Sequence, residues 1–223
     1  MEPEAGTPLG LELLNLRRSE YGEYARVQLL DLMDRPLGSV LDIGCARGAG
    51  ATAMRDRGAT HLVGLEIDSE YAEAARQRYD EVVTGSAEGD LPWGPASFDT
   101  VLCYDVLEHT YDPWSILRQL QTLLKPEGRL HVSLPNSRNV DFWRPLVLRG
   151  TVGYEPSGLR DVTHIRFFTR RDLAAMVNGA GFDILRADWT GELSRKRRLA
   201  VAATAGHAVE LFAYQWVVLA RPR

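Results

Sequence analysis

Glycine and acidic residues in the first third of the chain have types and spacing suited to a nucleotide-type pocket. Residues 40–43 form a short apolar strand that runs straight into a glycine-rich turn, where backbone N–H groups can approach a ligand. A second apolar stretch ends at Glu66, 22 residues after Gly44. An acid at about 20 residues' distance can hold ribose hydroxyls. We therefore expect Glu66 to bind a ribose and Asp42 to order the turn or to face an amino group of the ligand.

Two histidines further along are candidates for acid–base chemistry. Histidine titrates near neutrality and can take a proton from a hydroxyl. His164 lies in a segment rich in basic and aromatic residues, and we expect it to act as a general base. His109 is the second candidate. The alternative is that His164 only fixes its segment through hydrogen bonds to Asp161 or Thr163.

A short acidic cluster beside His109 could bind a metal ion. If residues 105–109 are helical, Asp105, Glu108 and His109 share one face. Such oxygen-rich ligands would suit magnesium or calcium, whereas one histidine does not make a zinc site. We expect no bound metal, with Glu108 and His109 ordering the loop and lining the substrate pocket instead.

Substrate specificity is expected in residues 137–168, because long connections of this kind are commonly lids or binding loops. Between 135 and 169, arginines and aromatic residues dominate, which suits an anionic acceptor with a flat or sugar-like body. A solvated face over an ordinary hydrophobic lid is the alternative. The basic run at 195–198 is expected to be solvated surface or to bind a phosphate or carboxylate of a large substrate. Candidate substrate-binding residues are Tyr21, Asn136, Trp143, Arg144, Tyr154 and Arg166.

The elements that position these residues alternate between strand and helix up to residue 136. That order implies a parallel sheet with right-handed crossovers, in which ligands bind beyond the carboxyl ends of the strands. Residues 181–187 and 212–220 are expected to add a sixth and a seventh strand. Residues 9–34 have apolar residues at near-helical spacing and predict a helical arm. We expect this arm to pack on the core; the alternative is that Tyr21 closes over the ligand.

Three blocks of sequence carry a family resemblance. The glycine-rich turn, Asp-Ile-Gly-Cys-Ala-Arg-Gly at 42–48, resembles the Asp-x-Gly-x-Gly-x-Gly loop of the class I S-adenosylmethionine-dependent methyltransferases, with Ala46 in place of a glycine. Residues 84–105 are similar to the adenine-side loop and fourth strand of that superfamily. Residues 123–136 resemble its Pro-x-Gly turn and fifth strand. A bacterial subgroup also has the Asp-x-Thr-His-x-Arg-Phe-Phe-Thr segment present at 161–169.

The resemblance implies an α/β, Rossmann-like, doubly wound sheet of seven mostly parallel strands with an antiparallel last strand. It implies one domain over 1–223: an arm (1–37), a cofactor-binding half (38–136), a lid (137–168) and a closing half (169–223). S-adenosyl-L-methionine is the implied cofactor. Ser86 stands where the family commonly has Asp, which would leave an adenine contact to backbone groups at Ala87 or Glu88. The expected cofactor-binding residues are Asp42, Gly44, Cys45, Ala46, Gly48, Glu66, Ile67, Ser86, Ala87, Glu88, Tyr104 and Asp105.

The expected reaction is methyl transfer to a small molecule, first to a hydroxyl of an anionic metabolite, sugar or natural-product intermediate. Alternatives are N-methylation, metal-assisted methylation of a quinone-type hydroxyl, and a partner subunit that binds the cofactor without catalysis. Release of S-adenosylhomocysteine with any acceptor would separate the last alternative from the others.

Composition limits the partners. The chain has 223 residues, 45% hydrophobic and 25% charged, as in a globular protein. Its net charge of −4 argues against nucleic-acid binding through overall charge. Its two cysteines predict small buried residues in a reducing compartment. Without a leader-like start or a long apolar run, we expect a cytoplasmic monomer or homodimer without a membrane partner.

Overall fold

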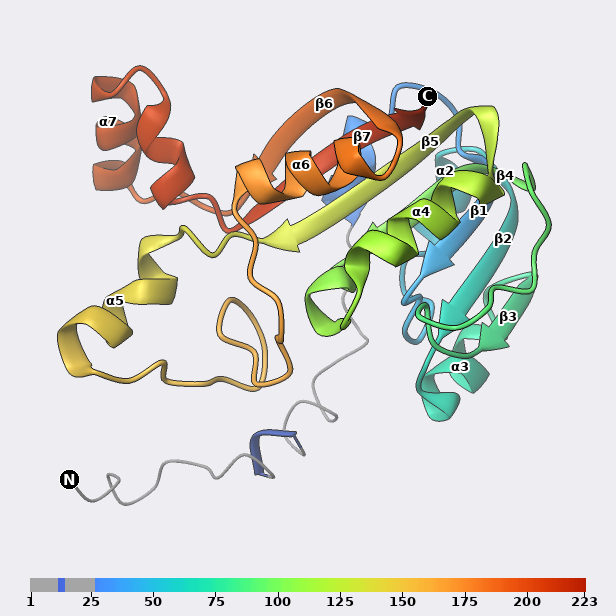
Figure 1. The fold of residues 1–223 in the computed structure, drawn as a ribbon, viewed down its shortest axis with the longest axis horizontal. Helices are drawn as coiled ribbons and strands as arrows, with labels where there is room; N and C mark the ends of the chain where they lie inside the picture. The colour runs from blue at the N-terminus through green and yellow to red at the C-terminus, as the bar shows by residue number, and fades with distance from the viewer. Residues whose placement is uncertain (1–11, 15–26) are drawn as a thin grey trace.

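The fold is built on a seven-stranded sheet, seen in a computed structural model that describes residues 12–14 and 27–223 (Figure 1). The strand order is β3-β2-β1-β4-β5-β7-β6, and β7 runs antiparallel to both β5 and β6, whereas the other pairs are parallel. The order reverses between β1 and β4, so the topological switch point lies there. The strands are β1 (Gly38–Ile43), β2 (Ala59–Glu66), β3 (Glu81–Thr84), β4 (Phe98–Tyr104), β5 (Leu124–Pro135), β6 (Phe182–Thr190) and β7 (Gln215–Pro222).

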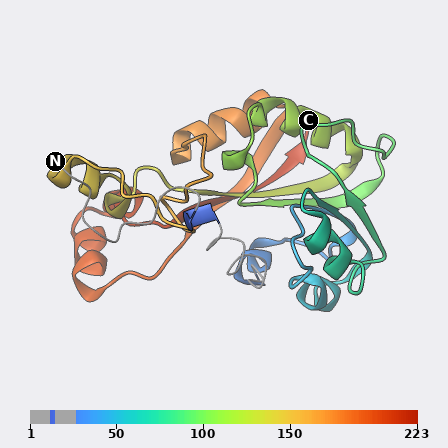
Figure 2. The ribbon, with the colours of Figure 1, turned by 90° about the horizontal axis from the view of Figure 1, so that it is seen from below.

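Helices cover both faces of the sheet. Figure 2 shows α4 and α6 on one face and η1, α2 and α3 on the other. The remaining helices, α5 and α7, lie beyond the carboxyl end of β5, away from the sheet. The helices are η1 (Val27–Leu32), α2 (Ala51–Asp56), α3 (Ser69–Ala75), η2 (Leu107–His109), α4 (Pro113–Leu123), α5 (Val140–Arg149), α6 (Arg170–Gly179), α7 (Arg195–Ala203) and η3 (His207–Leu211).

Two apolar layers hold the sheet between its helices. The central strands are apolar on both faces, as parallel strands buried on both sides must be. In α4, Ile116, Leu117 and Leu120 recur at helical spacing and face the larger layer. The N-terminus of α4 is fixed by Asp112, whose carboxylate accepts the N–H of Ser115 at 3.0 Å. The smaller layer packs β1 and β2 against η1, α2 and α3.

The seven strands and the antiparallel last strand confirm the predicted fold class. Three bounds differ from the sequence expectation. The fifth strand begins at Leu124, because Leu124 already pairs with Phe98 and a bulge carries the strand past the expected turn. The sixth runs on to Thr190, and the seventh begins at Gln215. Within the predicted arm, Val27–Leu32 forms a 3₁₀ helix, and Tyr21 lies outside the described residues.

In the part of the chain that the structure describes, no helix has the length and apolar character needed to cross a membrane. Both cysteines are buried and unbridged, as expected.

Candidate functional site

The glycine-rich turn after β1 closes against the end of β2 through backbone and carboxylate hydrogen bonds. Gly44, Ala46 and Gly48 all have positive φ, at 73°, 49° and 76°. Ala46 thus adopts the left-handed conformation that a Cβ disfavours. The Glu66 carboxylate explains this, because its Oε2 accepts the N–H of Ala46 at 2.9 Å. Its Oε1 accepts the N–H of Asp68 at 2.9 Å, so the sequence-distant acid also orders the turn.

Asp42 orders the turn from within the protein. Its Oδ2 accepts the hydroxyl of Tyr79 at 2.6 Å. Burial raises the pKa of Asp42 to about 7, the Tyr79 hydrogen bond opposes this, and the nearby Glu66 carboxylate adds to it. A proton on Asp42 therefore exchanges near neutral pH. Tyr79 could not be predicted as the partner of Asp42, because it lies 37 residues away in the sequence.

The residues expected on the adenine side lie in two loops. Ile67, which follows Glu66, is 72% exposed and offers an apolar surface beside the carboxylate. The hydroxyl of Ser86 accepts the N–H of Glu88 at 3.1 Å. The Glu88 carboxylate turns away to accept the N–H groups of Tyr111 and Asp112, at 2.9 and 3.0 Å. The cofactor contact through backbone groups at Ala87 or Glu88 stays a prediction.

Asp105 stands directly after β4 with an unusual backbone. Its φ is 55°, so residues 105–109 do not form one helix, and only Leu107–His109 form a 3₁₀ turn. The prediction that Asp105, Glu108 and His109 share one face of a helix is therefore wrong. Its Oδ1 accepts from the Ser133 hydroxyl at 3.2 Å and from the Gln215 amide. Gln215 was missed because its strand is distant in sequence.

Tyr104, expected to bind the cofactor, directs its hydroxyl into the protein. The hydroxyl lies 2.6 Å from Nδ1 of His131 on β5. His131 is fully buried, and burial lowers its pKa to about 3. The imidazole is therefore neutral, with Tyr104 as its hydrogen-bond partner.

Glu108, His109 and His164 come together across the lid. One ligand atom from each lies within 4.8 Å of the others, so the three could hold a metal ion. The side chains of Glu108 and His164 are 2% and 6% exposed, with Oε1 and Nε2 3.8 Å apart. The two imidazole rings have centroids 4.7 Å apart. Two histidines and one carboxylate favour zinc, manganese or iron over the magnesium or calcium considered from sequence.

Hydrogen bonds pin the lid over this cluster. The Thr163 hydroxyl donates to Oδ1 of buried Asp161 at 2.7 Å and lies 2.9 Å from Nδ1 of His109. Because that hydroxyl proton is used, Nδ1 of His109 must donate, which puts the lone pair of the neutral ring on Nε2. The Glu108 carbonyl accepts the N–H groups of Ile165 and Arg166, each at 3.0 Å. His109 is thus one side chain that fixes the lid, and the role of His164 as a general base stays a prediction.

The predicted substrate-binding residues are spread over different parts of the lid. Asn136 is fully buried, and its amide donates to the carbonyls of Glu210 and Ala213, so it anchors the end of β5 rather than facing a substrate. Arg166 donates to the Tyr111 carbonyl at 2.5 Å and lies over the Trp114 ring. Trp143, Arg144 and Tyr154 are exposed on α5 and the loop after it.

Several lid arginines are already paired. Arg138 bonds Glu210, and Arg160 bonds Glu155. These ion pairs reduce the positive charge that the lid can present to a ligand.

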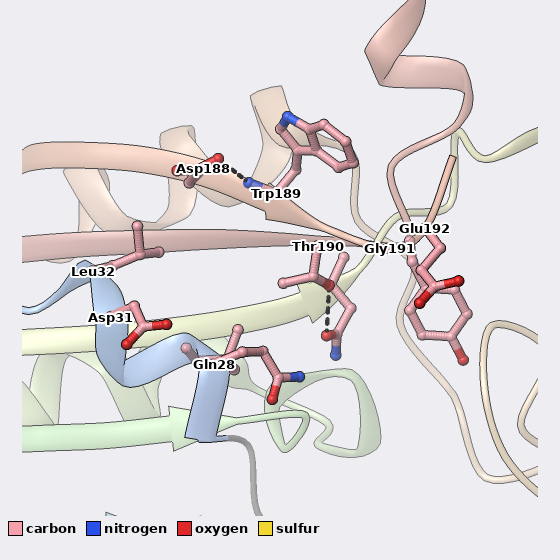
Figure 3. A pocket seen from close by; sticks show the side chains of 11 residues that line it. Gln28, Asp31, Leu32, Asp188, Trp189, Thr190, Gly191 and Glu192 are labelled. Carbon is pink, nitrogen blue, oxygen red and sulfur yellow. Dashed lines mark hydrogen bonds between the residues drawn. The ribbon is translucent and has the colours of Figure 1, made fainter. Parts of the chain in front are cut away.

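A cavity of about 610 Å³ lies between η1, the last residues of β6 and the first residue of β7 (Figure 3). Gln215, which bonds Asp105, lines it, and its Oε1 accepts the Thr190 hydroxyl at 3.1 Å. The lining includes Asp31, Asp188 and Glu192 and has no lysine or arginine among the described residues. Sequence inspection missed this cavity because its wall comes from three distant segments.

The fold and the crevice together define a class: a doubly wound α/β protein with a nucleotide-type site at its switch point. A Cβ on Gly44 would lie 2.5 Å from Cγ2 of Val106, so the backbone there leaves no room for a side chain. The tight turn, the buried Glu66 carboxylate and the exposed Ile67 surface fit the ribose and adenine of a nucleoside ligand.

The comparisons with known proteins give the family. Residues 17–187 match the family model described as a methyltransferase domain, and the chain belongs to this family. The ubiquinone biosynthesis O-methyltransferase of Aeromonas salmonicida is 32% identical over 163 residues, which is 68% of this chain and 65% of the relative's length. The chain thus spans slightly less than two thirds of that relative.

Solved structures agree on the fold. An S-adenosylmethionine-dependent methyltransferase from Mesorhizobium loti aligns with a TM-score of 0.62 at 15% identity, covering 87% of this chain and 95% of the other. The cyclase SpnF aligns with a TM-score of 0.62 at 18% identity, covering 94% and 91%. The sequence resemblance to class I methyltransferases is confirmed, and the family implies S-adenosyl-L-methionine as the cofactor.

Proposed function

We propose that this protein transfers a methyl group from S-adenosyl-L-methionine to a hydroxyl of a small molecule. The observation that carries the proposal is the cluster of His164, His109 and Glu108 at the end of β4, beside the cofactor crevice. A hydroxyl is a weak nucleophile and gains from a base, whereas a neutral amine needs none. An imidazole backed by a buried carboxylate suits that task.

The bound cofactor would supply an electrophilic methyl group on a positively charged sulfur. His164 would take the proton of the acceptor hydroxyl on a ring nitrogen, so that the hydroxyl oxygen can accept the methyl group that the cofactor would supply. The Glu108 carboxylate, 3.8 Å from His164 Nε2, stabilises the imidazolium that results. His109 and Thr163 hold the lid so that His164 stays in place.

For the acceptor, we propose a neutral hydroxyl compound rather than the anionic one expected from sequence. Arg138 and Arg160 of the lid are already in ion pairs with Glu210 and Glu155, so they are not free to bind an anionic acceptor. The name of the Aeromonas salmonicida relative makes a phenolic hydroxyl the first class to test.

Release of S-adenosylhomocysteine with a panel of phenols, sugars and amines tests the proposal. His164→Gln should lower kcat by 10²–10⁴ with an active hydroxyl acceptor, because general-base help has that size. His207→Gln, at an exposed histidine, is the matched control and should leave kcat unchanged. An unchanged kcat in His164→Gln would show that His164 is not the general base. Activity with amines but not with hydroxyl compounds would show that the protein is an N-methyltransferase rather than an O-methyltransferase.

A metal-assisted reaction at the same cluster is the second candidate, supported by the 4.8 Å grouping of Glu108, His109 and His164. A metal there would lower the pKa of the acceptor hydroxyl in place of a base. We propose the metal-free route, so turnover should persist in chelator. Loss of turnover in EDTA, restored by zinc or manganese, would favour the metal-assisted route. Cofactor binding without turnover of any acceptor would favour a non-catalytic role.

A further inference from the structure

Helix α5 lies at one end of the molecule, away from the sheet (Figure 1), and several of its apolar side chains are exposed. None of its residues is buried. Leu146, Val147 and Leu148 form its last turn, and Val147 and Leu148 are 67% and 73% exposed. Trp143, one turn earlier, is also exposed. Neighbouring exposed apolar residues of this size mark an interaction surface more often than single ones do.

Helix α7 adds charge at the same end. Arg197 of α7 bonds the Asp141 carboxylate of α5 at 2.6 Å, which joins the two helices. Together α5 and α7 carry six cationic side chains against one acid, a net charge of +5 in a chain whose total is −4. Figure 2 shows both helices at one end of the molecule. Leu199 of α7 adds a further apolar side chain, 63% exposed.

The cations of α7 stand where a helix disfavours them. Residues 195–198 form its first turn, at the positive end of the helix dipole, where acidic residues are stabilising and cations are not. The arrangement therefore opposes local stability, and an interaction with an anionic surface would offset that cost.

We propose that the α5–α7 end docks on an anionic lipid bilayer surface, with Leu146, Val147, Leu148 and Leu199 entering the interface and the exposed Arg195 and Lys196 contacting lipid phosphates. Apolar residues flanked by lysine and arginine are the pattern of interfacial membrane binding. The charge complementarity favours lipid over a second copy of this chain, because two such ends would repel each other. The sequence expectation of no membrane partner rested on the absence of a spanning segment, which does not bear on surface docking.

Docking would set the lid at the membrane, because α5 belongs to residues 137–168. An acceptor dissolved in lipid could then enter beneath the lid without crossing water. This surface stands apart from the histidine cluster, so lipid binding is measurable without turnover and fails independently of the proposed reaction.

Co-sedimentation of the full chain with phosphatidylcholine vesicles, with and without phosphatidylglycerol, tests the docking. Binding is expected only with phosphatidylglycerol and should weaken with salt. Arg195→Gln with Lys196→Gln should weaken it about 30-fold, since each cation near such a surface contributes about a factor of five. Arg118→Gln with Arg171→Gln removes two exposed arginines elsewhere and should have no such effect.

A second pair of variants tests the apolar contact. Leu148→Ser should weaken vesicle binding about tenfold, whereas Leu185→Ser, at an exposed leucine on β6, should not. Absence of binding to phosphatidylglycerol vesicles, or equal binding by variants and controls, would overturn the proposal. A dimer in sedimentation that Leu148→Ser dissociates would overturn it in favour of an interface between copies.

Discussion

Two buried titrating groups, Asp42 and His131, should give this protein opposing responses to acid. Asp42 has a pKa raised to about 7 in the folded state, against 3.8 as its ordinary value. Its contribution to stability is therefore present at low pH and is lost as pH rises through 7. His131 has a pKa lowered to about 3, against 6.5. Its contribution is present above 6.5 and is lost progressively as pH falls toward 3.

The size of each contribution to the free energy of unfolding follows from the difference in the number of protons bound by the folded and the unfolded states. Between about pH 7.5 and pH 5, Asp42 should add roughly 2–3 kcal/mol to the free energy of unfolding and His131 should remove about 2 kcal/mol. The two nearly cancel in the natural sequence. Asp42→Asn, which keeps an acceptor for Tyr79, should leave a protein that loses about 2 kcal/mol on acidification. His131→Asn should leave a protein that gains roughly 2–3 kcal/mol over the same range.

Urea unfolding followed by circular dichroism at both pH values measures these free energies. Each variant is compared with itself at the two pH values. The loss of stability from the cavity left by His131→Asn is the same at both values and therefore cancels. The double variant is the control and should respond like the natural sequence. Parallel pH responses of the two single variants would refute the assignment of these protonation states.

Two further substitutions test the turn and the lid. Gly44→Ala should lower the free energy of unfolding by at least about 2 kcal/mol, because the φ of 73° and the contact with Val106 both disfavour a Cβ. Thermal unfolding measures the effect. Gly94→Ala is the control, because a Cβ there would have no atom within 4 Å. Thr163→Val removes two hydrogen bonds worth about 1 kcal/mol each, so the acceptor KM should rise up to about 30-fold. An unchanged KM would show that the His109 contact does not hold the lid.

The sequence predicted the sheet and the cofactor crevice because both rest on local patterns. Each strand is a short apolar run, and the turn and Glu66 are set by spacing along the chain. Ala46 shows the limit: its left-handed backbone depends on the Glu66 carboxylate 20 residues away, a contact that no local rule gives.

The chemistry of the lid was harder to predict because it depends on pairing between distant segments. Both histidines were recognised, but their contact with Glu108 required the path of the lid. Asn136 was expected to bind substrate, whereas its burial against the η3–β7 segment makes it an anchor. The apolar end of α5 had no sequence signal, since exposure is decided by which neighbours pack against a helix.

Calorimetric titration of S-adenosylhomocysteine into the natural protein and Glu66→Gln tests the central claim, that the crevice after β1 holds the cofactor through Glu66. The natural protein should bind at one site, and Glu66→Gln should weaken binding by roughly 2–3 kcal/mol, the size of a hydrogen bond to a charged group. Glu81→Gln, an exposed acid on β3, should bind like the natural protein. Equal affinities for all three proteins, or no binding to any, would contradict the account.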